Sequence, residues 1–271
     1  MKVKDLLQQP SRASQREKHL LLSHLLKKKV SELYFFLDED LPEEIVKEYL
    51  RLLSMLENGY PLQYLIGEWD FYGRTFKVEE GLLIPRPETE ILVEKCLEKI
   101  PRERNILGFD IGIGTGCVSI TLLLERKNLT MYGDDVNDKA IKLARINAEL
   151  YGVQGRFIIL KGDMFEPVRG MRFNFVVSNP PYIPQREWKR LPRGVRLEGR
   201  MSLIGGEKGY EFYERFSKEV GDFLEDNGFF CLEIGHNQGS VVKELFSKEG
   251  FEVMVYKDYT NNDRVVLGWK P

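Results

Sequence analysis

Apolar residues recur at helical spacing in two stretches near the start of the chain. Residues three and four positions apart share one face of a helix, so such a stripe predicts a helix with a buried side. The first stripe is Leu20, Leu21, Leu22, Leu25 and Leu26, and the second is Ile45, Leu50, Leu53 and Leu56. Pro42 suits the first turn of the second helix, and Asn58-Gly59 suits its end. We therefore expect residues 1–59 to form a small helical bundle with its own core.

The pattern changes to β-prone residues after residue 59. These residues are Tyr64, Ile66, Trp69, Phe71, Tyr72, Phe76 and Val78. Gly67 and Gly73 interrupt them, as turn residues do. We interpret residues 60–87 as a β-hairpin that links two domains.

Two prolines stiffen the end of this linker. Pro85 and Pro87 both disfavour helix at the residue before them, which predicts an extended segment and then a helix over about 88–99. Two interpretations stay open. The segment is either a rigid linker or a wall of a substrate site, to which Pro85 and Arg86 would contribute.

From residue 105 onward, apolar strands alternate with helical stretches. Strands are expected at 106–110, 131–134, 157–160, 173–178, 228–233, 251–256 and 264–268, and helices near 116–126, 137–151, 210–224 and 238–249. This alternation predicts an α/β fold with a doubly wound, seven-stranded, Rossmann-like sheet, which we assign to residues 88–271. No helix separates the last two strands, so the final strand should be antiparallel.

The composition narrows the class of protein. The 271 residues are 42% hydrophobic and 30% charged with a net charge of -2, which suits a globular protein and does not suggest a general polyanion binder. Cys96, Cys117 and Cys231 are far apart and lack metal-ligand spacing, so we expect reduced buried thiols and no metal site. No signal core or apolar run long enough to cross a membrane occurs, which favours the cytoplasm and no membrane partner.

A glycine-rich turn follows the first strand of the expected sheet. Gly112, Ile113, Gly114, Thr115 and Gly116 place a glycine at every second position, which allows a sharp turn and close approach to a ligand. Nicotinamide and flavin folds also use such a turn. Their fingerprint, however, places the third glycine three residues after the second. The spacing here favours S-adenosylmethionine over a dinucleotide.

Further donor contacts are expected at the ends of the next two strands. An acidic residue about twenty positions after the glycine turn binds ribose hydroxyls in such folds. Asp135 is in the best position for this role, although either it or Asp134 could instead cap a helix. After the third strand, Asp163 and Met164 should flank the adenine.

The fourth strand leads into Asn179-Pro180-Pro181-Tyr182. The carboxyl edge of such a sheet is where ligands bind. The Asn179 side-chain oxygen and the Pro180 carbonyl can accept both N–H groups of a planar amide or amine, and the Tyr182 ring offers it a flat face. Preorganised acceptors would aim the nitrogen at a methyl donor. The alternative is a proline-rich turn that only ends the strand.

These motifs resemble the class I methyltransferases that carry an Asn-Pro-Pro-Tyr motif. More narrowly, the chain is similar to the peptide chain release factor glutamine methyltransferases, the HemK family. The resemblance runs over nearly the whole chain and is carried by 61–67, 84–90, 112–116, 179–182 and 205–209. Within it, Pro-Arg-Pro-Glu-Thr-Glu is the most specific segment. The chain departs from the family at Met164, where an aromatic residue is common, and in 198–203.

The resemblance implies a function and residue roles. The family methylates the side-chain nitrogen of the glutamine in the Gly-Gly-Gln loop of release factors. By position, Gly112, Gly114, Gly116 and Asp135 would bind the donor. Asn179, Pro180 and Tyr182 would hold the glutamine amide, and Asn179 would also lie beside the donor. We expect a monomer with release factors as partners and no stable nucleic-acid partner.

Two rival functions stay open at this stage. An adenine-N6 or guanine-N2 nucleic-acid methyltransferase can use the same tetrapeptide on a flipped base. A non-catalytic donor-binding protein is the second rival. The near-neutral charge and the lack of an evident target-recognition domain weigh against the first, and the intact motifs weigh against the second.

A basic segment follows the tetrapeptide. Within 186–200 the cationic residues are Arg186, Lys189, Arg190, Arg193, Arg196 and Arg200. Only Glu187 and Glu198 oppose them. The segment is either a solvated loop or a docking surface for an acidic protein or RNA.

Overall fold

The computed structural model describes all residues from 1 to 271 and divides them into two compact units. The first comprises Met1–Glu68 together with Pro192–Leu197. The second comprises Trp69–Leu191 and Glu198–Pro271. The short segment 192–197 thus belongs to the first unit although it lies far along the chain.

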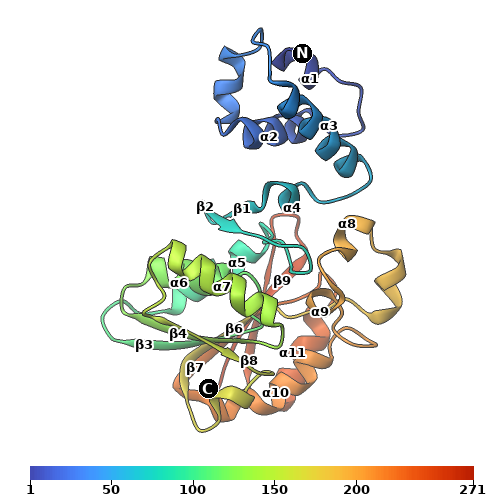
Figure 1. Cartoon of the computed structure of the whole chain (residues 1–271). Helices are drawn as coiled ribbons and strands as arrows, with labels where there is room; N and C mark the ends of the chain where they lie inside the picture. The colour runs from blue at the N-terminus through green and yellow to red at the C-terminus, as the bar shows by residue number, and fades with distance from the viewer. The chain divides into compact units, whose positions relative to one another are not determined.

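The first unit is helical, as expected from the leucine stripes (Figure 1). Its elements are α1 (Val3–Leu7), α2 (Gln15–Leu26), η1 (Val30–Phe35), α3 (Glu43–Glu57), α4 (Leu62–Ile66) and α8 (Arg193–Arg196). Ser14 begins α2, because its hydroxyl accepts from the Glu17 N–H while the Glu17 carboxylate accepts from the Ser14 N–H. Leu21 and Leu53 are among the buried residues of this core.

The expected hairpin is present but shorter than predicted. Its strands are β1 (Glu68–Phe71) and β2 (Arg74–Lys77). Tyr72 and Gly73 both have positive φ, which is the geometry of a tight two-residue turn. The strand interpretation of Tyr64 and Ile66 was wrong.

Those two residues lie instead in helix α4, for a local reason. Pro61 precedes the helix and its carbonyl accepts from the Leu65 N–H. Gly67, with φ of 78°, ends it. One proline and one glycine spaced for a single helical turn therefore outweighed the β-propensity of the aromatic residues.

The second unit is built on the predicted seven-stranded sheet, in the order β5-β4-β3-β6-β7-β9-β8. The strands are β3 (Ile106–Ile111), β4 (Leu129–Asp135), β5 (Phe157–Lys161), β6 (Phe173–Ser178), β7 (Leu224–Glu233), β8 (Glu252–Lys257) and β9 (Asp263–Trp269). Strands β3 to β7 pair in parallel, whereas β9 is antiparallel to both β7 and β8. The expected antiparallel final strand is confirmed.

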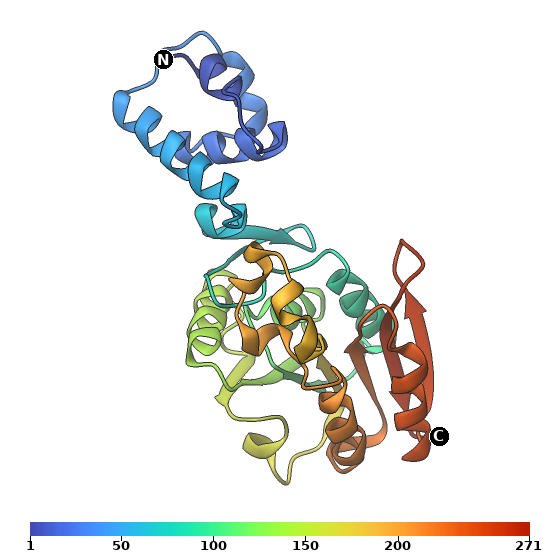
Figure 2. The same cartoon turned by 90° about the vertical axis from the view of Figure 1, so that its right-hand side faces the viewer.

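Helices cover both faces of this sheet, as the strand alternation requires (Figures 1 and 2). One layer contains α5 (Thr89–Lys99), α6 (Cys117–Glu125) and α7 (Asp138–Leu150), and the other contains α10 (Glu211–Phe223) and α11 (Gly239–Lys248). Phe175 and Val177 of β6 face the first core, and Val176 faces the second. Short helical turns η2 (Glu166–Val168), η3 (Gln185–Arg190) and α9 (Arg200–Leu203) connect these elements.

The three cysteines are buried and form no disulfide, as expected. None of the helices combines the length and the apolar character needed to cross a bilayer.

Candidate active site

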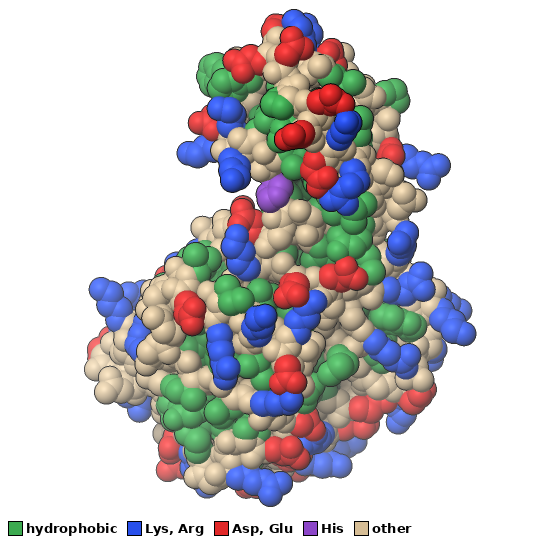
Figure 3. Space-filling view, viewed as in Figure 1, with side chains coloured by type: hydrophobic (Ala, Val, Ile, Leu, Met, Phe, Trp, Pro, Cys, Tyr) green, Lys and Arg blue, Asp and Glu red, His purple; other side chains and the backbone are tan.

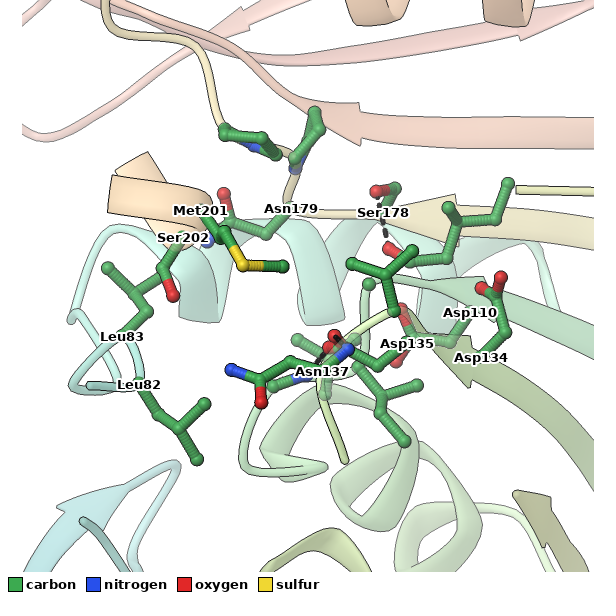
Figure 4. A pocket seen from close by; sticks show the side chains of 18 of the residues that line it. Leu82, Leu83, Asp110, Asp134, Asp135, Asn137, Ser178, Asn179, Met201 and Ser202 are labelled. Carbon is green, nitrogen blue, oxygen red and sulfur yellow. Dashed lines mark hydrogen bonds between the residues drawn. The ribbon is translucent and has the colours of Figure 1, made fainter. Parts of the chain in front are cut away.

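A cavity of about 210 Å³ opens at the carboxyl ends of the central strands of the second unit. Loops after β3, β4, β5 and β6 contribute to its lining, as does the segment before α5. In Figure 4, Asn179 and Met201 lie on one side of the space, and Asp135 and Asn137 lie on the other. The chain builds the sheet outward in one direction from β3 and in the other direction from β6. An open sheet of this kind binds ligands at such a change of direction.

The predicted glycine turn forms one wall of this cavity. Gly112 and Gly114 have φ values of 73° and 53°, a conformation that disfavours other residues. A Cβ on either glycine would meet no atom within 4 Å, so the backbone there borders open space. The Gly112 and Ile113 amides both donate to the Asp134 carbonyl at 3.0 Å, which ties the turn to the end of β4.

Gly116 has a different role from the other glycines of the turn. It precedes α6 with φ of 79° and does not line the cavity. A Cβ there would lie 3.1 Å from Ile120 Cδ1 and 3.2 Å from the Ala144 Cβ. Gly116 therefore allows close packing of α6 against α7.

Asp135 lies in the cavity wall and holds two loops together. Its carboxylate accepts from the Gly114 N–H at 3.0 Å and from the Asn137 N–H at 2.9 Å. Burial raises the pKa of Asp135 above its ordinary value, and these backbone donors oppose that shift. Asn137 in turn caps α7 by accepting from the Lys139 N–H. The Asp135 carboxylate therefore joins two loops by hydrogen bonds and also borders the cavity.

Two further carboxyl groups line the cavity: that of Asp110, which the sequence did not single out as a ligand contact, and that of Asp134, the weaker candidate beside Asp135 at the same strand end. Asp110 accepts from the Ser119 hydroxyl at 2.7 Å, and burial raises its pKa to about 7. Asp134 is 1% exposed, one of its carboxyl oxygens has no hydrogen-bond partner, and burial raises its pKa to about 8. Their positions at strand ends were a usable signal, but their burial was not visible in the sequence.

The loop after β5 brings Asp163 and Met164, the residues expected to flank the adenine, to the cavity. Met164 is buried with φ of 56°. The Asp163 carboxylate pairs with Arg215 of α10. The Met164 side chain thus supplies apolar surface at this side of the cavity.

The tetrapeptide after β6 divides between the cavity and the core. Asn179, Pro180 and Pro181 line the cavity, but Tyr182 does not. The Tyr182 hydroxyl instead donates to Glu233 Oε1 at 3.4 Å, and the ring packs against the core. The Asn179 side-chain amide donates to Thr89 Oγ1 at 3.1 Å.

The extended segment before α5 forms another wall. Leu82, Leu83, Pro85 and Thr89 line the cavity. Arg86 does not; its guanidinium pairs with the buried carboxylate of Glu198, which also accepts from the Ile84 N–H at 3.2 Å. Glu198 is one of the two acidic residues of the basic segment 186–200, and its carboxylate is thus already paired with Arg86.

Other lining residues were missed by the sequence reasoning. They are Ile111, Cys117, Val118, Val136, Asn137, Ser178, Met201, Ser202 and Phe212 in addition to Leu82, Leu83 and Thr89. Thr89 stood inside the quoted Pro-Arg-Pro-Glu-Thr-Glu segment, and Asn137 stood at the expected start of a helix. Met201, Ser202 and Phe212 carry no local signal, because only the chain path after η3 returns them to the cavity.

Comparison with known proteins identifies both parts of the chain. Residues 87–191 match the family described as methyltransferase small domain, and residues 2–67 match the one described as PrmC N-terminal domain. A protein of Aquifex aeolicus named release factor glutamine methyltransferase is 50% identical over 98% of this chain and 95% of its own length. One of the same name from Bacillus cereus is 39% identical over 92% of this chain and 90% of its own length.

Solved structures agree on the fold. A methyltransferase from Pyrococcus furiosus matches 73% of this chain and 89% of its own with a TM-score of 0.55. At 20% identity, that likeness shows a shared fold alone.

Proposed function

Because the chain belongs to the family of release factor glutamine methyltransferases, we propose that it methylates a release factor. The methyl group passes from S-adenosylmethionine to the side-chain amide nitrogen of a glutamine, in the Gly-Gly-Gln loop that the sequence resemblance implies. The observation that carries the proposal is the shared cavity of the glycine turn and Asn179. The named relatives lend no support to the rival activity on nucleic-acid bases.

The lining residues fit the proposed methyl donor. Gly112 and Gly114 leave open space beside the backbone where a ligand can approach closely. Asp135 presents a carboxylate that suits ribose hydroxyls, and Asp134 has a buried oxygen without a partner. Leu82 and Met164 add apolar surface for a flat base. We assign Gly112, Ile113, Gly114, Thr115, Asp135, Asp163 and Met164 to donor binding on this basis.

The acceptor side of the proposal rests on Asn179 and Pro180. An amide nitrogen is a poor nucleophile because its lone pair is delocalised. Asn179 Oδ1 and the Pro180 carbonyl would accept its two N–H groups and hold the nitrogen in one orientation. When bound, S-adenosylmethionine supplies an electrophilic methyl carbon on a positively charged sulfur. No general base is required of this chain, since the charged product nitrogen is acidic.

Three residues that were expected to bind the methyl donor or the methyl acceptor have supporting roles in this proposal. Gly116 packs α6, Arg86 pairs with Glu198, and Tyr182 donates to Glu233. We propose that Tyr182 and Arg86 shape the acceptor side through those contacts. Pro85 and Pro181 are proposed as walls of the acceptor site because both line the cavity.

A labelling experiment tests the substrate. The protein is incubated with methyl-labelled S-adenosylmethionine and, in parallel, a release factor, duplex DNA or RNA. Label on the Gly-Gly-Gln glutamine, absent from a Gln→Ala factor, is the expected result. Label on nucleic acid alone would overturn the substrate assignment and retain the fold and amino-nitrogen chemistry. Label on neither would overturn the enzymatic proposal.

Substitution of Asn179 tests the site. Asn179→Ala should lower turnover by about 10²–10³-fold, as expected for loss of a preorganised electrostatic contact. Donor affinity, measured by calorimetry, should change by less than about threefold, an effect under 1 kcal/mol. Turnover near that of the unmodified protein would contradict the role of Asn179.

The proposal extends to partners and location. We propose that the protein acts as a monomer on release factors in the cytoplasm, without a stable nucleic-acid partner. Sedimentation of the protein with and without a release factor tests the monomer, and tRNA or duplex DNA in the same experiment tests the last point.

A further inference from the structure

A buried chain of hydrogen bonds runs from the cavity into the core behind Asn179. The Asn179 amide nitrogen donates to Thr89 Oγ1 at 3.1 Å, and the Thr89 hydroxyl donates to Glu233 Oε2 at 2.6 Å. Thr89 is 3% exposed and Glu233 is 1% exposed. The three residues come from the end of β6, the first turn of α5 and the end of β7. The bond between Thr89 and Glu233 is therefore closed to solvent.

The direction of the bonds follows from the number of protons available. An ionised carboxylate only accepts hydrogen bonds, so the Thr89 hydroxyl must donate its single proton to Glu233. The Thr89 oxygen can then only accept from Asn179. That requires the NH₂ end of the Asn179 amide to face Thr89 and leaves Oδ1 as the group available to the cavity.

This orientation matters because the two ends of an asparagine amide have nearly the same shape. With Oδ1 toward the cavity, Asn179 accepts a hydrogen bond from an incoming amide NH₂ group. With the amide turned over, two N–H donors would face one another. One hydrogen bond made or lost therefore separates the two orientations.

We propose that Thr89 and Glu233 are positioning residues that fix the amide of Asn179 with its oxygen toward the methyl acceptor. The inference rests on the proposed function of Asn179 and extends it to two residues outside the tetrapeptide. Neither residue needs to touch the substrate nitrogen. Both act through the orientation of Asn179.

The groups around Glu233 determine when this arrangement holds. Tyr182 donates to its other oxygen, the Tyr213 hydroxyl donates to its backbone carbonyl, and Arg264 of β9 and Glu88 exert opposite electrostatic effects. Burial raises the pKa of Glu233 to about 7, an effect opposed by Thr89, Arg264 and Tyr182. Below that pH, a protonated Glu233 can donate to Thr89, whose proton then turns toward Asn179. The amide would then be free to turn over.

Substitutions at Thr89 test the proposal. Thr89→Val keeps the shape and removes both hydrogen bonds, so kcat should fall about tenfold, which corresponds to the loss of one hydrogen bond. Donor affinity by calorimetry and the KM for release factor should change less than about twofold, under 0.5 kcal/mol. Thr89→Ser restores the hydroxyl and should restore most of kcat.

Thr121→Val is the matched control. Thr121 is a fully buried threonine in α6 whose hydroxyl has no hydrogen-bond partner, so the same change there should leave kcat unaltered. A loss of kcat in Thr121→Val equal to that in Thr89→Val would assign the effect to general packing and overturn the inference.

The double variant separates this inference from the proposed function. If Thr89 acts through Asn179, adding Thr89→Val to Asn179→Ala should have no further effect on kcat. Full activity of Asn179→Ala would refute the proposed site itself. A large loss in Asn179→Ala with no loss in Thr89→Val would refute only the positioning role.

The pH profile gives a readout that a purely structural role would not alter. In the unmodified protein, kcat should fall on the acid side of about pH 7, where Glu233 gains a proton. Glu233→Gln should lower the plateau several-fold, because glutamine can present oxygen or nitrogen to Thr89, and should remove that acid limb. Persistence of the limb in Glu233→Gln would overturn the pH-dependent part of the inference.

Discussion

The carboxyl group of Asp134 at the cavity has an unusual protonation state because it is buried. Asp134 is 1% exposed and one of its oxygens has no partner. Burial, together with the nearby carboxylates of Asp135, Asp110 and Asp163, raises its pKa to about 8. The folded protein without donor therefore holds a proton there at neutral pH that the unfolded chain releases.

The consequence is a stability that falls as pH rises. Between the ordinary pKa of 3.8 and about 8, the folded state binds more protons at Asp134 than the unfolded state, so the free energy of unfolding decreases with pH. Asp134→Asn should remove this part of the slope. From pH 6 to 8.5, the loss of stability should be smaller in the variant by on the order of 2 kcal/mol.

Urea unfolding of donor-free protein at both pH values measures the effect. Asp226→Asn, at an exposed position of β7, is the control and should keep the slope of the unmodified protein. Asp110, whose pKa burial also raises, contributes a further slope in all three proteins. Equal slopes in the unmodified protein and Asp134→Asn would show that Asp134 is ionised in the folded state.

At the scale of elements, the glycine turn combines ligand access with helix packing. Gly112 and Gly114 border open space, whereas Gly116 lies against Ile120 and Ala144. One end of the turn therefore borders open space, and the other end lets α6 pack closely on α7. A single repeating motif thus has two physical functions.

Gly116→Ala and Gly152→Ala distinguish these effects. Both glycines have positive φ, but a Cβ on Gly152, just after α7, would meet no atom within 4 Å. Gly152→Ala should lower the free energy of unfolding by about 1 kcal/mol through backbone strain alone. Gly116→Ala should lower it by about 2–4 kcal/mol, since overpacking adds to the strain. Equal losses in urea unfolding would contradict the packing role.

At the scale of the whole molecule, the basic segment divides between the two compact units. Arg193 and Arg196 belong to the first unit, where Arg193 donates to the Asn58 carbonyl at 3.0 Å. Lys189 and Arg190 belong to the second unit and are exposed, and their side chains make no hydrogen bond or ion pair. Figure 3 shows Lys and Arg side chains gathered where Figure 1 places α8. Charge reversal at Arg193 would therefore disturb a structural contact as well as any docking surface.

Lys189 and Arg190 give the cleaner test of docking. If the segment holds an acidic surface of the release factor, Lys189→Glu with Arg190→Glu should raise KM for the factor about tenfold at low salt, with less effect at high salt. Lys218→Glu with Lys243→Glu makes the same change in net charge at exposed positions of α10 and α11. Equal KM values for the two double variants at low salt would leave the segment as a solvated loop.

The predicted elements rest on local physics. Apolar periodicity predicted the sheet, its helices and the antiparallel last strand, because burial of one face needs a fixed repeat. The turn after β3 was predictable because positive φ favours glycine. Helix α4 was missed because the β-prone aromatic residues there suggested strand, while Pro61 and Gly67 set a single helical turn.

The candidate site was only partly visible in the sequence for a different reason. The sequence by itself determined which chemical groups end each strand, including Asp135 and Asn179. Only the tertiary structure decided that Asn179 bonds to Thr89, 90 residues away, and that Thr89 bonds to Glu233, 144 residues away. It also turned Tyr182 toward Glu233 and left Asp134 without a partner. Such contacts depend on which strand ends and helix turns pack together. A local sequence pattern does not encode which distant residues will meet.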